Sequence, residues 1–547
     1  MKFFIAILSV ILFSGTSAAQ LQNTPPPKPK LVVGILIDQM RWDYLMRFKP
    51  LFKNNGGFKR MMNNGFNCNN TMINYAPTVT ACGHACVYTG SVPNIHGIVG
   101  NSWWDKLDNK MAYCTEDKNV EGIGNVKKDA GKMSPKNMLV TTIGDELRLA
   151  SNFKSKVIGV AVKDRGSILP AGYSANAAYW YDKGTGSFIS SSYYTKELPK
   201  WLNEFNDRKL VDSFYKLGWD IKLPKATYLQ YCSNDIENYE SKTFGDSALG
   251  FPYNNLVKYI NKDYNKVIST PYGNTLTAEI AKAALINEKL GKGDETDMLA
   301  ISFSSPDYIG HSFGPNSWEL LDCYIKLDEE LGKLFDVLDK QIGLGNYLSF
   351  LTADHAVAQV PGFLKEHKLP GGVFDDGAAK KEMNKQLKEI FAIDTAILAF
   401  ENYQISLNKK AIHLLKIDEE KIVKWILNYL KQNDAVMNAF ELSELMEIPM
   451  NKTIREMLAN GYFENRSGDI QIILKSGYID GMKTGTTHGL WNPYDAHIPL
   501  LWYGWGIKKG NTHKETYMTD IAATLAALLD IQMPSGCVGK VIEDIVK

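Results

Sequence analysis

The sequence predicts an α/β protein with a doubly wound, mostly parallel central sheet flanked by helices. Two observations support this fold class. Short, continuous apolar segments have the length and composition of strands buried on both faces of a sheet. Longer segments with helical periodicity lie between them, so strands alternate with helices along the chain. The composition, 45% hydrophobic and 22% charged over 547 residues, is that of a globular protein.

The charge balance excludes several classes of function. The chain has 61 basic and 60 acidic side chains and a formal net charge of +1. We find no basic stripe or polybasic tail that could neutralise nucleic-acid phosphates or anionic lipid headgroups. We therefore expect no nucleic-acid partner and no binding to a membrane surface.

The first 30 residues read as a targeting segment and a spacer. Lys2 precedes an apolar run over residues 3–13, and small residues follow up to Ala19, which is the pattern of a cleaved leader peptide over residues 1–19. The alternative is a membrane anchor, but the run is shorter than the ~20 residues that span a bilayer. We expect a periplasmic or secreted protein with no membrane span after cleavage. Residues 20–30 form a proline-rich spacer.

The predicted elements then follow in order. The first strand is the apolar segment 31–37, which ends at Asp38. Strands of the same type are predicted at 157–162, 298–303, 347–352 and 498–503. Helices are predicted at 137–149, 276–290, 318–338 and 520–529.

Two regions interrupt the alternation. Residues from about 172 to 264 are rich in Tyr, Ser, Asn and Lys, and they contain a predicted hairpin around Asp182–Gly186. Residues from about 371 to 478 contain helical patterns such as 419–430 before strand-like segments resume. We interpret both regions as cap segments inserted into a single core over residues 31–547.

The seven cysteines allow up to three disulfides in an exported protein and leave at least one thiol unpaired. The sequence does not determine the pairing of Cys68, Cys82, Cys86, Cys114, Cys232, Cys323 and Cys537. Cys82 and Cys86 flank His84, which raises the alternative of a zinc site or a reactive thiol. Their spacing matches no standard zinc module, so we expect a structural role.

Aspartate and histidine side chains, which commonly bind metal ions and are called metal-type side chains below, follow the predicted strands. Ligands in an open α/β sheet bind beyond the carboxyl ends of the strands, so these side chains could converge there. The candidates are Asp38, Asp307, His311, Asp354, His355 and His488. Three carboxylates and three imidazoles would suffice for two zinc sites with open positions. Taken singly, each could be a turn residue or a structural histidine, as we expect for His84, His96, His367, His413, His497 and His513.

Thr80 is the candidate nucleophile. It lies at a turn into a predicted helix, where exposed N–H groups and the helix dipole favour an anionic group. A threonine hydroxyl becomes a competent nucleophile when a divalent metal holds it as the alkoxide. Local sequence alone leaves open the alternative that Thr80 is a helix N-cap.

These motifs together resemble the alkaline phosphatase superfamily, and especially its nucleotide pyrophosphatase/phosphodiesterase branch. The similarity rests on Thr80 with downstream His84 and the segment Thr89–Asn101, on 307–311, on 352–355 and on 487–489. Thr78 is the competing hydroxyl, but Thr80 has the spacing to the following His and to Asn101 that the resemblance implies. It implies that Asp38, Asp354 and His355 bind one zinc together with the Thr80 oxygen. It also implies that Asp307, His311 and His488 bind a second zinc. Residues 81–83 depart from the aromatic, Pro and Asn that usually follow the nucleophile in diesterases.

Lys163 and Arg165 favour a monoester substrate. A phosphate monoester has a charged oxygen at the position where a diester has a neutral ester group. Two additional cations in the site therefore favour binding of a monoester. In an extended backbone the two side chains would share one face, although they could also be an ordinary surface pair. With Asn101 they resemble PafA-type bacterial alkaline phosphatases.

This resemblance implies an exported, monomeric enzyme with two zinc ions that hydrolyses small phosphate monoesters. Thr80 would form a covalent phosphothreonine, while Asn101, Lys163 and Arg165 bind the phosphate oxygens. Three alternatives are weighed against it: a phosphodiesterase or nucleotide pyrophosphatase of the same fold, a sulfatase, and a non-catalytic zinc- or phosphate-binding protein. A sulfatase is disfavoured because its nucleophile would be a modified Cys or Ser.

Overall fold

The structure is a computed structural model that describes residues 28–481 and 483–546. The predicted leader, residues 1–19, and most of the predicted spacer, residues 20–30, lie outside the described residues. No helix in the described part of the chain has both the length and the apolar character needed to cross a membrane.

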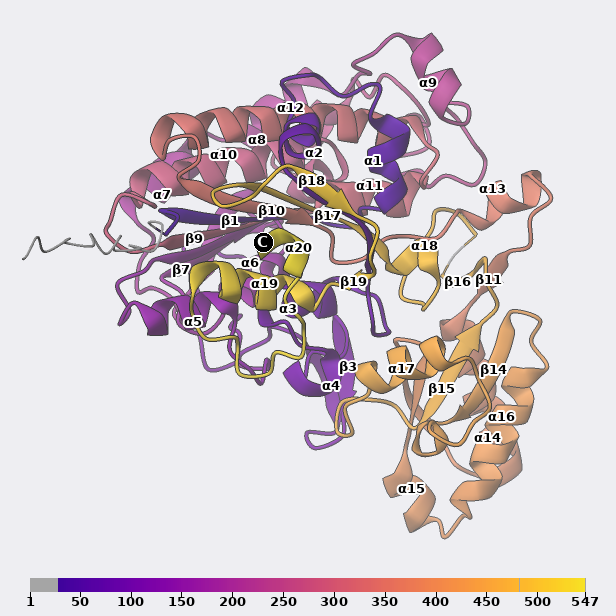
Figure 1. The fold of residues 1–547 in the computed structure, drawn as a ribbon. Coiled ribbons are helices and arrows are strands. Elements are labelled where there is room, and N and C mark those ends of the chain that lie inside the picture. The colour runs from indigo at the N-terminus through magenta and orange to yellow at the C-terminus, as the bar shows by residue number, and fades with distance from the viewer. Residues whose placement is uncertain (1–27, 482, 547) are drawn as a thin grey trace, which may run out of the picture.

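An eleven-stranded sheet forms the centre of the molecule (Figure 1). The strand order is β18-β2-β17-β10-β1-β9-β6-β7-β8-β5, and β19 pairs with β2. The five strands β10, β1, β9, β6 and β7 run parallel to one another, whereas β17 is antiparallel to β10. The bounds are β1 Leu31–Ile37, β2 Phe66–Met72, β5 Gly122–Ile123, β6 Val157–Ala161, β7 Ala177–Asp182, β8 Ser187–Ser191, β9 Asp297–Phe303, β10 Tyr347–Thr352, β17 His497–Gly504, β18 Gly510–Thr512 and β19 Thr516–Tyr517.

The predicted fold class is confirmed. Each of the five apolar segments forms a strand of this sheet, with ends that differ from the prediction by no more than one residue. The parallel strands are buried along their whole length, which is why they read as continuous apolar runs rather than as alternating patterns.

Helices cover both faces of the sheet (Figure 1). One layer contains α2 Gly57–Asn64, α7 Lys200–Asp207, α8 Leu210–Leu217, α10 Tyr272–Asn287 and α12 Trp318–Gln341. The other layer contains α3 Thr80–Thr89, α5 Ile143–Ala150, α6 Asp164–Ala171 and α19 Asp520–Leu529. The other helices of the core connect these elements: α1 Trp42–Phe48, α4 Pro93–His96, α9 Lys225–Tyr231, η1 Leu256–Tyr259, η2 Tyr264–Ser269, α11 Ser305–Phe313, α13 Pro361–Glu366, α18 Pro493–Ala496 and α20 Glu543–Val546.

One predicted helix starts later than expected. The segment 137–149 becomes helical only at Ile143, because Thr142 and Asp145 form a capping box there. The predicted helix at 276–290 is instead α10, which begins at Tyr272 directly after Pro271.

The two regions that interrupt the alternation differ in structure. The predicted hairpin around Asp182–Gly186 forms, and its strands β7 and β8 belong to the central sheet. Residues 372–480, called the cap unit below, have a four-stranded antiparallel sheet in the order β12-β13-β15-β14 and an apolar core of their own (Figure 1). Its elements are β11 Gly372–Phe374, α14 Asp376–Phe391, β12 Ile397–Glu401, β13 Gln404–Leu407, α15 Lys409–Leu414, α16 Glu419–Lys431, β14 Val436–Glu441, η3 Leu442–Glu444, α17 Lys452–Gly461, β15 Ile470–Leu474 and β16 Tyr478–Asp480.

The structure does not contain the disulfides that the cysteine count allowed. All seven cysteines, each within the described residues, are free thiols. Cys82 and Cys86 are buried in α3, and Cys82 Sγ donates to the carbonyl of Ile98. Burial raises the pKa of both thiols well above the ordinary value, which agrees with the structural role expected from their spacing.

Candidate active site

The topology brings the candidate side chains to one edge of the sheet. β1 lies between β10 and β9, so the carboxyl ends of these three parallel strands are neighbours. Asp38 follows β1, Asp354 follows β10, and Asp307 lies in α11 just after β9. The Asp38 N–H donates to the carbonyl of Phe303, which fixes the end of β1 against the end of β9. Residues distant in sequence thus meet where ligands bind in open α/β sheets.

One group of metal-type side chains consists of Asp307, His311 and His488. His311 Nε2 lies 3.1 Å and His488 Nε2 lies 3.7 Å from Asp307 Oδ1. Residues 305–313 form the helix α11, so Asp307 and His311 share a face at i and i+4 despite Pro306 and Gly310. This group has the membership expected from the sequence.

The second group differs from the expected set in one member. The ligand atoms that lie together belong to Asp38, Asp307 and His355. Asp354 lies beside them, with Oδ2 3.6 Å from His355 Nε2, while its Oδ1 accepts hydrogen bonds from the N–H groups of Gln39 and His355. Asp307 therefore borders both groups, and only Oδ2 of Asp354 is available to a metal ion.

The three imidazoles are oriented in the same way. Nδ1 of His311, His355 and His488 lies 2.8, 3.0 and 2.7 Å from a backbone carbonyl oxygen, respectively. A carbonyl oxygen only accepts, so each Nδ1 carries the proton and each Nε2 has a free lone pair. Backbone contacts of this kind orient histidine ligands in metal sites.

The donor atoms fit a divalent cation. Asp38 Oδ1 and Asp354 Oδ2 are buried and accept no hydrogen bond from the described residues, whereas Asp38 Oδ2 pairs with Lys163 Nζ. His355 Nε2 faces Asp38 Oδ1 at 3.5 Å, which places one acceptor against another. Buried acceptors in such an arrangement need a cation among them. Carboxylate oxygen with imidazole nitrogen is the donor set that zinc uses in catalytic sites.

The carboxylates have opposite pKa shifts. Burial, with added repulsion from Asp307 and Asp354, raises the pKa of Asp38 well above its ordinary value. Burial alone would also raise the pKa of Asp307, but the positive charge of Lys163 is the main effect that opposes burial, and this pKa lies well below the usual range. The site thus combines a strongly ionised carboxylate with one that needs a further positive charge.

Thr80 is the first residue of α3 and faces the metal-type side chains. Its Oγ1 lies 3.3 Å from His355 Nε2 and 3.4 Å from Lys163 Nζ, and the residue is buried. The N-cap of α3 is Val79, so the alternative that Thr80 caps the helix is wrong. Its hydroxyl is thus placed beside two cationic or metal-binding groups at a helix N-terminus.

Lys163 and Arg165 do not share a face of an extended backbone. Lys163 has an extended conformation, but the chain turns into α6 at Asp164, so Arg165 points from the first helical turn. Lys163 Nζ lies 2.6 Å from both Asp38 Oδ2 and Asp307 Oδ2. Arg165 Nη1 instead donates to the hydroxyl of Tyr113 at 3.1 Å, and its Nε is buried without a hydrogen-bond partner in the described chain.

Asn101 is fixed next to the start of α3. Its Oδ1 accepts a hydrogen bond from the N–H of Ala81 at 3.0 Å, directly after Thr80. Because the carbonyl end of the amide is occupied by this contact, the NH₂ end is the one that can donate to an anion beside Thr80.

Gln39 was not identified from the sequence, and the contacts of His84 with the site were not predicted. The Gln39 N–H donates to Asp354 Oδ1, and its side-chain amide donates to Asp307 Oδ1 at 2.8 Å. His84, which we expected to be structural, lies with Nδ1 2.8 Å from the carbonyl of Thr80 and 3.2 Å from Asp354 Oδ2. The glycine at position 310 was a possible sign of the Gln39 contact, since a Cβ at this position would lie 1.9 Å from Gln39 Oε1.

Comparison with known proteins places the chain in a family. The model of the type I phosphodiesterase / nucleotide pyrophosphatase family matches residues 32–495. Alkaline phosphatase PafA of Elizabethkingia meningoseptica is 46% identical over 541 residues, which cover 99% of this chain and 98% of that protein. Alkaline phosphatase PhoV of Synechococcus elongatus is 47% identical over 549 residues, with 99% and 98% coverage. The crystal structure of wild-type PafA has a TM-score of 0.93 at 46% identity and covers 95% of this chain and 100% of its own. The chain belongs to the type I phosphodiesterase / nucleotide pyrophosphatase family, within the alkaline phosphatase superfamily.

Proposed function

We propose that this protein is an exported, zinc-dependent alkaline phosphatase that hydrolyses phosphate monoesters through a covalent phosphothreonine. The observation that carries the proposal is the position of Thr80 Oγ1, 3.3 Å from His355 Nε2 and 3.4 Å from Lys163 Nζ. The PafA and PhoV relatives, both named alkaline phosphatases, support it. The leader pattern over residues 1–19 supports export to the periplasm or the medium.

The proposed ligands are the sets that the family resemblance implies. One zinc ion would be held by Asp38, Asp354, His355 and the Thr80 oxygen, and the other by Asp307, His311 and His488. Two zinc ions, when bound, would supply the positive charge that lowers the pKa of the Thr80 hydroxyl and offsets the charge of the reacting phosphate. Nδ1 contacts to backbone carbonyls hold the three imidazoles in the required orientation.

The chain itself supplies the nucleophile and the groups that bind the phosphate. Thr80 Oγ forms a bond to phosphorus as the ester P–O bond breaks, and the leaving alcohol departs with a proton. Water then breaks the Oγ–P bond, which releases phosphate and restores the hydroxyl. Asn101, Lys163 and Arg165 bind the phosphate oxygens.

The two cations and the amide favour a monoester over a diester. Lys163 is buried at the carboxylate cluster, and the buried Arg165 Nε has no partner among the described residues. Both positive charges would meet the additional charged oxygen of a monoester, which a diester lacks. The family also includes phosphodiesterases and nucleotide pyrophosphatases, which are therefore the second candidate activity.

We further propose a monomer with a single core over residues 31–547. In this division, residues 172–264 and 371–478 are insertions that shape access to the active site. The separate apolar core of the cap unit supports the second insertion.

The test compares an aryl phosphate with its bis-aryl ester, using purified protein with its bound metal quantified. We expect faster turnover of the monoester and loss of activity on chelation that zinc restores. Thr80→Ala should reduce turnover by at least about 1,000-fold, because no other described side chain occupies the place of the nucleophile. Thr80→Ser, which keeps a hydroxyl, is the matched control.

Each other outcome points to a different function. Preference for the diester would make the protein a phosphodiesterase. Tight binding of zinc and phosphate without turnover would indicate a non-catalytic binding protein. A Thr80→Ala variant with wild-type turnover would refute the nucleophile assignment.

A further inference from the structure

The tip of a cap-unit hairpin reaches the active-site loops. β12 and β13 are joined by a two-residue turn, Asn402–Tyr403, and Glu401 pairs with Gln404 on either side of it. Asn402 has φ 55° and Tyr403 has φ 61°. Two consecutive left-handed residues define a tight hairpin turn, which projects both side chains from a regular sheet. The tip is therefore a well-defined structure and not a loose loop.

Asn402 contacts the backbone on both sides of Asn101. Its Nδ2 donates to the carbonyl of Ser102 at 2.8 Å. The same atom packs on Gly100, where an added Cβ would lie 2.3 Å from it. Asn101 Oδ1 itself accepts a hydrogen bond from the N–H of Ala81, the residue after Thr80. The backbone that carries Asn101 is thus held from the cap unit at both of its neighbours.

Tyr403 contacts the loop that carries His488. Its ring packs on Gly489, where a Cβ would lie 2.9 Å from Cε2, and its hydroxyl donates to the carbonyl of His488 at 3.4 Å. This loop in turn joins the segment before Thr80, since the N–H of Thr78 donates to the carbonyl of Gly489. One turn therefore touches both the candidate phosphate-binding loop and a candidate metal-binding loop.

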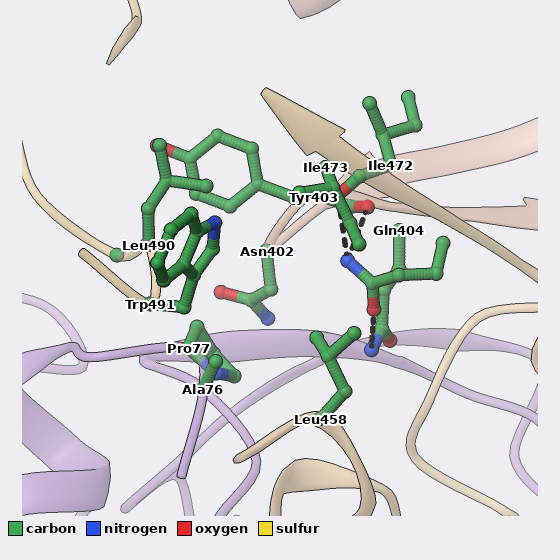
Figure 2. Close-up of a pocket in the computed structure, with 12 residues that line it drawn as sticks. Ala76, Pro77, Asn402, Tyr403, Gln404, Leu458, Ile472, Ile473, Leu490 and Trp491 are labelled. Atoms are coloured by element: carbon green, nitrogen blue, oxygen red, sulfur yellow. Dashed lines mark hydrogen bonds between the residues drawn. The ribbon is translucent and has the colours of Figure 1, made fainter. Parts of the chain in front are cut away.

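The tip packs against residues of both the cap unit and the core. The carbonyl of Tyr403 accepts hydrogen bonds from the N–H of Ile472 and the side-chain amide of Gln471. Figure 2 shows Asn402 between Trp491 and Leu458, with Pro77 below it. The cavity among these residues has about 10 Å³, which is room for about one water molecule.

We propose that the Asn402–Tyr403 turn is a positioning element of the active site, in which Asn402 fixes the Asn101 amide for phosphate binding. The inference rests on the proposed function, because it assigns Asn101 to the phosphate. Asn402 acts through the backbone of residues 100–102 and does not touch the substrate. A displacement of Asn101 by about 1 Å would weaken its contact with phosphate severely.

The test uses the zinc-loaded full chain and the substitution Asn402→Gly. Glycine adopts the left-handed conformation without strain, so this variant removes the amide and keeps the turn. The control is Asn408→Gly, since Asn408 caps α15 and its side chain bonds to Thr395 and Ala411 within the cap unit. We measure the dissociation constant of inorganic phosphate by calorimetry, together with kcat and KM for an aryl phosphate and the melting temperature.

We expect Asn402→Gly to raise the dissociation constant of phosphate by about 10-fold, because the Asn101 amide is no longer held in place. Zinc content should equal that of the wild type, and Asn408→Gly should leave the phosphate affinity unchanged. In an Asn101→Ala background, Asn402→Gly should have no further effect on phosphate affinity, since both substitutions remove the same contact.

Two results would overturn the proposal. One is wild-type phosphate affinity in Asn402→Gly. The other is an effect of Asn402→Gly that is as large in the Asn101→Ala background as in the wild type, because the turn would then act generally on stability. Failure of the proposed function would appear differently, as a wild-type protein without monoester turnover, and the calorimetric comparison would still decide the role of Asn402.

Discussion

Gln39 illustrates how single residues support this site. It has φ 66°, a left-handed conformation that is uncommon for residues other than glycine. In this conformation its N–H donates to Asp354 and its side chain donates to Asp307. One residue directly after a candidate ligand therefore orients two further carboxylates. The strained backbone is retained because two contacts depend on it.

Replacement of Gln39 by Leu should weaken metal binding. Leucine fills a similar volume but leaves Asp307 Oδ1 without its amide donor. Loss of a residue that orients a metal ligand typically costs about 10- to 100-fold in metal affinity. Zinc affinity is measured by competition with a chromophoric chelator, and thermal unfolding serves as the control for stability. Unchanged zinc affinity would show that the Gln39 amide has no role in orienting Asp307.

Among the elements, α3 connects the nucleophile to the sheet edge. All ten of its residues are buried, and Thr80 occupies its N-terminal position. Gly83 lets the helix approach the backbone of Asp354, since a Cβ at this glycine would lie 2.2 Å from the Asp354 carbonyl oxygen. This close approach positions Thr80 and Asp354 together, because both are carried by the surfaces in contact.

Gly83→Ala should therefore lower both stability and activity, although it adds only one methyl group and changes no candidate site residue. The methyl group collides with backbone, which cannot rotate away, so α3 and the Asp354 segment must separate. We expect a loss of about 1 to 3 kcal/mol in unfolding free energy, the typical cost of overpacking, and a large fall in kcat. Gly293→Ala is the control, because no atom lies within 4 Å of a Cβ there.

Chemical denaturation and turnover of an aryl phosphate measure the two effects. Equal stability and turnover in Gly83→Ala and Gly293→Ala would contradict the close packing of α3 on Asp354.

At the scale of the whole molecule, most of the cap unit packs around its own apolar cluster, but Phe440, Met457 and Ile473 of the cap unit belong to the apolar cluster of the core. The core and the cap unit also contact each other where the Asn402–Tyr403 turn and α17 meet the loops of the core. The candidate metal ligands lie in the core, and the Asn402–Tyr403 turn joins the cap unit to the loops that carry Asn101 and His488. An insertion far away in the sequence thus contacts two loops that carry candidate site residues.

The stability of the whole fold should depend on pH through His96. Burial lowers the pKa of this side chain to about 3, and its Nδ1 accepts the N–H of Ile98. The unfolded chain binds a proton below about pH 6.5, whereas the folded protein does not, so this residue causes stability to be lost as pH falls from about 6.5 toward 3.

His96→Asn should remove this pH dependence, because the asparagine oxygen can accept from Ile98 and does not titrate. The unfolding free energy of the wild type relative to the variant should fall by about 2 kcal/mol between pH 7 and pH 5. Urea denaturation of both proteins at equal zinc loading measures the difference. Parallel pH profiles for the two proteins would contradict the prediction.

Much of the fold could be predicted because strand and helix patterns are local. The segments 31–37 and 347–352 form strands with the predicted bounds, since strands buried on both faces leave continuous apolar runs. The helix predicted at 137–149 starts only at Ile143, because the start of α5 depends on a capping box rather than on periodicity. The predicted pairing of Lys163 and Arg165 on one face was wrong, because the chain turns into α6 between them.

The sequence by itself determined the fold class, the identity of the metal-type side chains and the resemblance to a phosphatase superfamily, since these depend on residue type and order. Only the tertiary structure decided that Asp307 borders both groups of ligands, that Gln39 and His84 contact the site, and that a turn of the cap unit holds the Asn101 loop. The physical reason is that these contacts join residues far apart in the chain. Hydrogen bonds and close packing between such residues leave no periodic pattern in the sequence.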